Sequence, residues 1–148
     1  MNPPLRLLGA FQQIAEKEPQ HLLRLEERQM WVAAEIIGGF PYTIIVPDMN
    51  ARTSFDRRSA KLKKTFRNRS LPSWAHYMAG AVGMLDREGL EMSGANIVIV
   101  GDEPLGPRYE HALGLAFVAL WHQINEQEYN EKDLISMMDM VRRDYISS

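Results

Sequence analysis

Apolar residues recur along this chain with two spacings, which predict helices in some stretches and strands in others. A spacing of three or four from Leu5 to Ala15 predicts a helix that begins after Pro3-Pro4 and is ended by Pro19. A second, short helix is expected over 21–28. Strands are predicted over 29–37, 42–46 and 96–100, which are rich in apolar or β-branched residues or bounded by turn residues. One or two further strands are expected at roughly 52–57 and 61–66.

The second half of the chain is mainly helical by the same criterion. A helix is predicted from Ser73, whose side chain suits an N-cap, to Glu88, and Gly89 is expected to end it. Gly80 and Gly83 lower the helix propensity of this stretch, so both are expected to permit close packing.

The last two helices differ in polarity. The stretch 109–124 is apolar almost all round, which predicts a buried helix. Asn130 is expected to cap a final helix over 131–145. The order of elements predicts a mixed α/β fold, an α+β two-layer sandwich, formed by one domain over 1–148.

The composition is that of a globular protein: of 148 residues, 45% are hydrophobic and 24% are charged. The absence of cysteine excludes disulfides and thiolate metal sites. No apolar run approaches the roughly 18 residues of a membrane span, and the first residues lack the form of a signal peptide. We therefore expect no membrane partner and a cytoplasmic location.

The net charge of −2 conceals an uneven distribution. The basic segment, residues 52–69, carries eight cations and one acid, Asp56, so its net charge is +7 and that of the remainder is −9. Such a segment is either a patch for a polyanion such as RNA or the solvated face of a strand pair, and charge runs favour the second. The eight cations are Arg52, Arg57, Arg58, Lys61, Lys63, Lys64, Arg67 and Arg69.

A candidate site lies where the strand 96–100 runs through a turn at Pro104 and Gly106 into the apolar helix. A strand, a glycine turn and a helix start together can bind an anion. Here, however, the first turn of the helix carries the bulky Arg108 and the acidic Glu110, which suit a phosphate poorly.

The acidic side chains of this loop have two interpretations. Asp102, Glu103, Glu110 and His111 could form an acid/base cluster; alternatively, Glu110 serves the helix N-terminus and the first two lie in solvent, which we favour. His111 is roughly 16 Å from His122 along the helix, too far to share a metal ion, so no metal site is expected.

The stretch from Trp74 to Tyr145 resembles the N-terminal domain of GHMP sugar kinases, and most of all galactokinases. The resemblance rests on the helix Trp74-Ala75-His76-Tyr77-Met78-Ala79-Gly80 and on the strand that leads from Gly94 into the turn Pro104-Leu105-Gly106. It implies the fold of that domain, which a ribosomal-protein domain shares, and an ATP-dependent phosphotransfer to a sugar in intact members.

The chain departs from the family at the phosphate loop. The resemblance places the family's second loop glycine at Arg108 and its serine positions at Glu110, His111 and Ala112. Arg108 could itself fill the volume that a phosphate would occupy. The sugar-binding signature is absent from 34–41, and the sequence stops before the position of the family's catalytic aspartate, so no catalytic residue is assigned.

These departures predict a galactokinase-like domain without phosphotransfer, which acts as a binding or assembly module and needs no cofactor. The soft apolar surface of Met137, Met138 and Met140 favours a homo-oligomer or a protein partner. The first alternative is an active or fragmentary sugar kinase that uses ATP and Mg²⁺. The second alternative is polyanion or RNA binding through the basic segment.

Overall fold

The computed structural model describes residues 2–15 and 17–147. Its helices and strands are α1 (Leu5–Ala15), β1 (His21–Leu25), β2 (Met30–Ile36), β3 (Tyr42–Val46), β4 (Ala51–Phe55), α2 (Arg57–Lys61), α3 (His76–Arg87), β5 (Ala95–Gly101), α4 (Pro107–Ile124) and α5 (Glu131–Val141). Short 3-10 turns η1 (Glu26–Arg28), η2 (Pro47–Met49) and η3 (Ser73–Ala75) connect them, and a π turn, η4 (Arg142–Ile146), follows α5.

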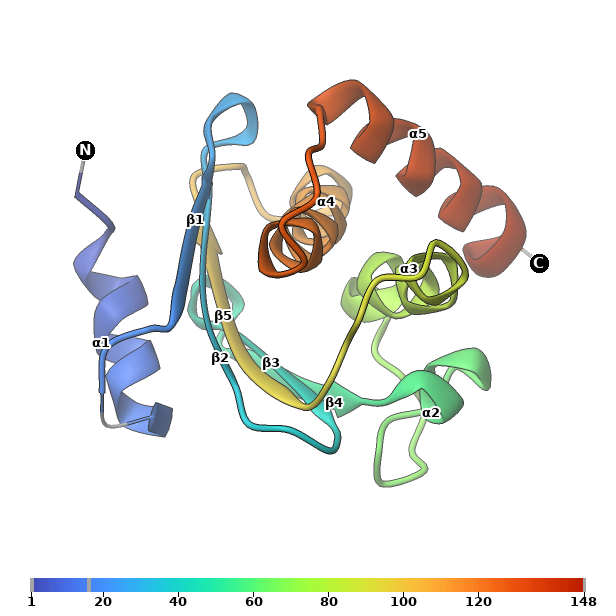
Figure 1. Ribbon diagram of the computed structural model, residues 1–148, viewed down its shortest axis with the longest axis horizontal. Helices are drawn as coiled ribbons and strands as arrows, with labels where there is room; N and C mark the ends of the chain where they lie inside the picture. Colours follow the sequence, from blue (N-terminus) through green and yellow to red (C-terminus); the bar gives the residue numbers. More distant parts are fainter. Residues whose placement is uncertain (1, 16, 148) are drawn as a thin grey trace.

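The five strands form one mixed sheet in the order β1-β2-β5-β3-β4. β5 pairs antiparallel with β2 and parallel with β3. Helix α1 covers one face of the sheet, α3 and α4 cover the other, and α5 packs outside them (Figure 1). The mixed α/β sandwich is confirmed, with α1 as an additional layer behind the sheet.

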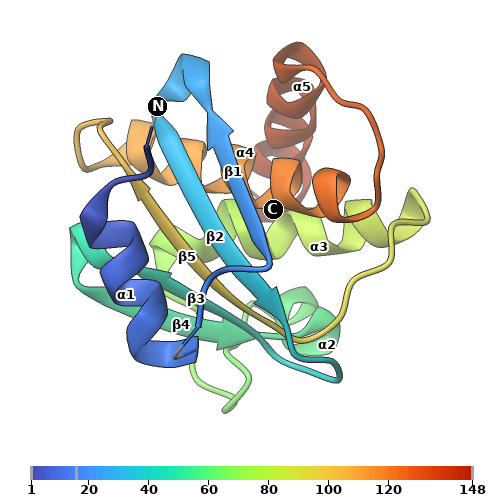
Figure 2. The same cartoon turned by 60° about the vertical axis from the view of Figure 1, so that its left-hand side comes forward.

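The central strand β5 contributes to the core on both faces, as its continuous apolar sequence predicts. Val98 and Val100 pack with Leu7 and Phe11 of α1, whereas Ile99 belongs to the larger core beneath α3 and α4. Helix α4 runs across the second face of the sheet (Figure 2). Its residues 112–121 are all buried. The prediction of a buried helix here is confirmed.

The helix predicted over 21–28 is wrong. Residues 21–25 instead form the edge strand β1, which pairs with β2, and η1 follows. Leu23 and Leu25 are buried, whereas Leu22 before them is exposed and Arg24 between them is only half-buried, which is the period of two of a half-buried strand. Pairing with β2 therefore outweighs the helix propensity of the local leucines and glutamates.

The second strand predicted in the basic segment is also wrong. Its first strand is confirmed as β4, but the chain then forms helix α2, with Asp56 accepting the Ser59 N–H in a capping box. After α2, the only strand-like pairing among the described residues that follow, up to η3, is one isolated bridge between Lys64 and Ser70.

The predictions for the start and end of the helices have mixed outcomes. Asn130 caps α5 through the Asp133 N–H, as expected. Ser73 is not an N-cap: it opens the turn η3 after Pro72, and no side-chain cap is found there in the described residues. Gly89 adopts a positive φ after α3, as a helix-ending glycine does.

The two glycines within α3 have different surroundings. A Cβ at Gly80 would lie 2.6 Å from Val141 Cγ1 and 2.7 Å from Tyr145 Cδ1, so this glycine lets α3 approach the C-terminal helix. A Cβ at Gly83 would meet no atom within 4 Å. The expectation of close packing is confirmed for Gly80 and wrong for Gly83.

These surroundings predict opposite effects for the same substitution. Gly80→Ala should lower the free energy of unfolding by about 1–3 kcal/mol, because an added methyl overpacks the contact with Val141 and Tyr145. Gly83→Ala should raise it by up to about 1 kcal/mol, because alanine is the better helix former in open space. Urea unfolding of both variants measures the difference, and equal effects would contradict this packing of α3.

Candidate functional site

The loop between β5 and α4 lies where the sheet register brings three segments together. Met30 of β2 pairs with Gly101 at the end of β5. In the parallel pairing of β3 with β5, Ile45 lies beside Val98, so continuing the register by three residues places Asp48 beside Gly101. The loop 102–106 therefore begins between η1 on one side and η2 on the other.

Asp48 anchors one side of this loop. Its carboxylate accepts hydrogen bonds from the Tyr109 hydroxyl at 2.6 Å, from the Gly101 N–H at 2.8 Å and from Arg6 Nε at 2.8 Å. Burial alone would raise the pKa of Asp48, but these hydrogen bonds outweigh burial and hold the pKa below its ordinary value. Burial and then the Asp48 carboxylate raise the pKa of Tyr109, which stays protonated.

Arg28 of η1 anchors the other side. Its Nε donates to Glu103 Oε1 at 2.9 Å, one terminal nitrogen lies 3.1 Å from His111 Nδ1, and the other donates to the Arg108 carbonyl at 3.1 Å. The side chains of Arg28 and Glu103 are only 14% and 10% exposed, so this is a nearly buried ion pair. One guanidinium thus joins the loop, the helix start and the connection between β1 and β2.

The charges around His111 determine its protonation. A guanidinium can only donate, so His111 Nδ1 must accept from Arg28. Burial, followed by the positive charges of Arg28 and Arg142, lowers the pKa of His111. The ring is therefore neutral at physiological pH and lies edge-on to the Tyr77 ring, with a centroid distance of 5.2 Å.

The predicted site residues lie close together but with different orientations. Pro104 is exposed, and Gly106 has the positive φ of 130° that turns the chain into α4. Glu110 and His111 are half-buried on the first turns of α4, whereas Ala112 is fully buried in the core and faces no ligand.

Three expectations for the loop are corrected. Glu103 does not lie in solvent but is held by Arg28 and, at 3.4 Å, by Arg108; Asp102 is exposed as expected. Arg108 does not fill the helix start, because its side chain is 78% exposed; Arg28 lies there instead. Glu110 makes no capping hydrogen bond among the described residues of α4.

Sequence reasoning missed Arg28 and Asp48 altogether. Both are remote from the loop in sequence, and η1 was expected to be the end of a helix. The signal that could have found them is the pairing of β5 with β2 and β3, which fixes both neighbours of Gly101.

A basic cavity of about 360 Å³ opens beside the start of α4. Three guanidinium groups and one imidazole contribute to its wall, and Glu103 is the carboxylate that pairs with two of these cations. Such a wall can attract an anion, although the Arg28 and Arg108 charges are partly compensated. The lining residues are Arg28, Pro107, Arg108, His111 and Arg142.

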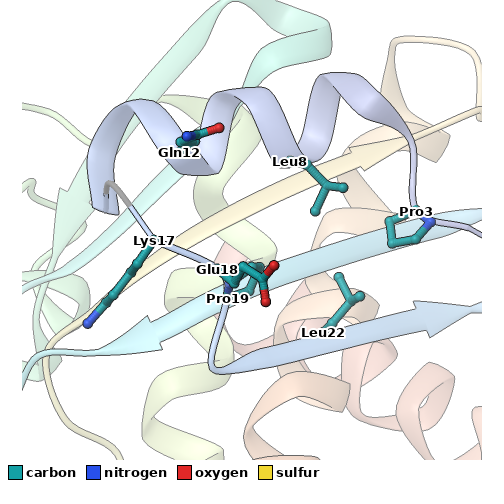
Figure 3. A pocket seen from close by; sticks show the side chains of 7 residues that line it. All are labelled: Pro3, Leu8, Gln12, Lys17, Glu18, Pro19 and Leu22. Atoms are coloured by element: carbon teal, nitrogen blue, oxygen red, sulfur yellow. The ribbon is translucent and has the colours of Figure 1, made fainter.

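A second cavity, of about 500 Å³, lies between α1 and the edge strand β1. Leu8 of α1 and Leu22 of β1 point toward each other across it, and Pro3 and Pro19 close its ends (Figure 3). Lys17 at its rim is paired with Glu35 at 3.5 Å. This cavity is an apolar groove without a cluster of titratable groups, so it does not suggest a catalytic centre.

The described residues contain no group of three or more His, Asp or Glu side chains placed to hold a metal ion. None of their helices has both the length and the apolar character that crossing a membrane requires.

The position of Arg28 predicts a change in the titration of His111. Arg28→Met should raise the His111 pKa, because a nearby positive charge is removed, whereas the exposed and distant Arg52→Met should leave it unchanged. The wild-type protein should lose stability as the pH falls below about 6.5, since the unfolded histidine then binds a proton more readily than the folded one. This loss should be smaller in Arg28→Met. Titration of the imidazole NMR signals measures the pKa, and an unchanged value in Arg28→Met would contradict the contact.

Known proteins resemble this chain in structure and not detectably in sequence. No protein-family model matches it, and no curated protein matches it. Galactokinase from Lactococcus lactis, solved with galactose, superposes with a TM-score of 0.67 and 16% identity over 96% of this chain. A mevalonate kinase and the Methanococcus jannaschii mevalonate kinase superpose with TM-scores of 0.61 and 0.59, at 14% and 12% identity, over 80% and 77% of this chain.

The chain spans only 42%, 38% and 36% of the lengths of these three kinases. Identities this low establish the fold alone. The resemblance that the sequence suggested is confirmed at that level: the chain has the fold of the GHMP-kinase N-terminal domain.

Proposed function

We propose that this chain is a GHMP-kinase-like domain that has lost phosphotransfer and acts as a binding or assembly module. The observation that carries the proposal is the position of the Arg28 guanidinium at the start of α4. It is engaged there with Glu103, His111 and the Arg108 carbonyl. Protein groups thus already engage the guanidinium that would otherwise be available to a phosphate at this helix start.

The first turn of α4 supports the same proposal. Pro107 has no N–H to donate, and the Tyr109 side chain is turned into the core toward Asp48. Glu110 in this turn already places a negative charge at the positive end of the helix dipole. A nucleotide phosphate would be repelled by that carboxylate and would find no serine hydroxyl there.

The second candidate is an active or fragmentary sugar kinase that uses ATP and Mg²⁺. The basic cavity favours it, because Arg28, Arg108 and Arg142 bring three cations to the helix start. In this case Arg28 would exchange Glu103 for a phosphate, and residues outside this chain would complete the site. The ion pair with Glu103, only 10% exposed, opposes that exchange.

Calorimetric titration with ATP and Mg²⁺ separates the two candidates. We expect no binding in the micromolar range for the wild-type protein. Arg28 is already engaged at the helix start, and the Glu110 carboxylate there repels a phosphate. Micromolar binding that tightens in Glu110→Ala, together with galactose-dependent release of ADP, would refute the loss of phosphotransfer. Glu91→Ala, an exposed carboxylate on another loop, is the matched control for the change in net charge.

The assembly role rests on the outer face of α5. Ile135 and Met140 are 38% and 44% exposed, and Met137 and Met140 line a cavity of about 450 Å³ against α3. The rim carries both Arg87 and Asp144, so two copies related by a two-fold axis could place opposite charges together. We propose that a second copy of this chain covers this face.

Sedimentation velocity tests this assembly. The wild-type protein should form a dimer as its concentration rises, and the double variant Ile135→Lys/Met140→Lys should stay monomeric, because two charges would be buried in the interface. Leu5→Lys, on the 86% exposed side chain of α1, should leave the dimer intact. A wild-type monomer at every concentration, or a dimer that survives the α5 substitutions, would contradict the proposal.

A further inference from the structure

We propose that the end of the molecule formed by the β2–β3 turn and the basic segment binds single-stranded nucleic acid. Its cations would contact backbone phosphates, and two exposed phenylalanine rings would stack with bases. This surface is independent of the helix start of α4. Three features support it: cations without a carboxylate partner, two exposed aromatic rings and a hollow beside Phe66.

Most cations of the basic segment are not neutralised. Arg57 pairs with Asp86 at 2.8 Å, and the Lys63 ammonium lies 5.2 Å from the centre of the Tyr145 ring. Among the described residues the other six cations have no carboxylate partner within 4.0 Å: Arg52, Arg58, Lys61, Lys64, Arg67 and Arg69. Five of the six lie on α2 or on the loop between α2 and η3, whereas Arg52 lies on β4 opposite Ile45, toward the η2 end of the sheet. This density of uncompensated charge is the electrostatic feature of a nucleic-acid surface.

Two aromatic rings lie exposed beside these cations. Phe40 in the β2–β3 turn is 67% exposed, Phe66 in the loop after α2 is 42% exposed, and their ring centres are 6.1 Å apart. Phenylalanines that served only the core would be buried. Exposed rings among cations are instead typical of proteins that stack the bases of single strands.

The backbone holds both rings in place. The Phe66 N–H donates to the Ser54 carbonyl of β4 at 2.8 Å, which fixes the loop after α2 to the sheet. The turn that carries Phe40 is fixed by the Gly94 N–H, which donates to the Gly39 carbonyl at 2.6 Å. A Cβ at Gly94 would lie 2.5 Å from the Gly38 carbonyl oxygen, so this approach requires glycine. The stacking surface is therefore preorganised, which lowers the entropy lost on binding.

A hollow of about 260 Å³ lies beside Phe66, between α2 and the following loop. Arg58 and Lys64 contribute to its wall, together with the polar side chains of Ser59, Thr65 and Asn68. The carboxylate that also lines it, Asp56, accepts the Ser59 N–H in the cap of α2. Polar groups of this kind can hydrogen-bond base edges, and the cations can receive phosphates.

These features favour a single strand over a duplex or a membrane. A duplex keeps its base faces stacked, so the two rings would have no partner there. An anionic membrane would attract the cations, and the 62% exposed Leu62 could enter the lipid. However, Leu62 and Phe66 are the two apolar residues among the eight that line the hollow, and the six polar or charged ones suit nucleotides better than acyl chains.

Fluorescence anisotropy with labelled oligouridylate and oligothymidylate tests this proposal on the full chain. Binding should weaken steeply with salt, with a slope of log affinity on log salt of about −0.7 for each phosphate contacted. Lys61→Gln/Lys64→Gln should make this slope shallower by about 1.4. Phe40→Ala should weaken binding by about 5-fold to 100-fold without changing the slope, because the substitution removes a stacking contact but no charge. Lys132→Gln/Arg24→Gln, with the same loss of charge elsewhere, is the control.

The outcomes that would overturn the proposal are distinct. Equal effects of the two double variants would show non-specific attraction to polyanions. A Phe40→Ala variant that binds as well as the wild-type protein would remove the stacking role. Stronger binding to phosphatidylserine vesicles than to oligouridylate would assign the surface to a membrane. Phe40 is well exposed, and its variant should unfold at the wild-type urea concentration, which separates loss of binding from loss of structure.

Discussion

The burial of helix α4 is the constraint on which the rest of this structure depends. Every side chain from Ala112 to Trp121 packs against the sheet or the neighbouring helices, so the helix cannot shift without disturbing the core. Its start must then be fixed by partners inside the protein. Asp48 and Arg28 provide them from opposite sides, through hydrogen bonds to charged groups, which are stronger than neutral ones.

The groups that fix this helix also determine what can bind beside it. Arg28 is the natural partner for a phosphate, yet it is committed to Glu103 and to the helix backbone. A ligand would have to displace a nearly buried carboxylate from Arg28, which would leave Glu103 only its longer contact with the exposed Arg108, and breaking a buried ion pair costs up to about 3–5 kcal/mol. Stability and phosphate binding therefore compete for the same guanidinium. In the function that we propose, this competition is how a kinase-like fold would be retained with the loop serving as a structural connection.

The sequence predicts the elements whose apolar pattern is decisive and misses those set by distant partners. The β-branched run of β3, the continuous apolar run of β5 and the unbroken apolar α4 have few alternatives. β1 was missed because leucine and glutamate favour a helix locally, and only β2 provides the pairing that makes it a strand. α2 was missed because its cap, Asp56 with Ser59, lacks the usual glutamate or glutamine. For the site, the turn at Pro104 and Gly106 could be found from the sequence, whereas Arg28 and Asp48 required the sheet register.

The two ends of the central strand carry different chemistry. Gly101 at the end of β5 leads into the loop held by Arg28, whereas Ala95 at its beginning lies beside Tyr42 and the turn that carries Phe40. Seven residues of extended strand separate these points by about 20 Å. At that distance charges are largely screened at physiological salt, so neither surface determines the protonation or occupancy of the other. A domain of this fold can therefore lose the chemistry at one end of its sheet while the other end is free to carry a different binding role.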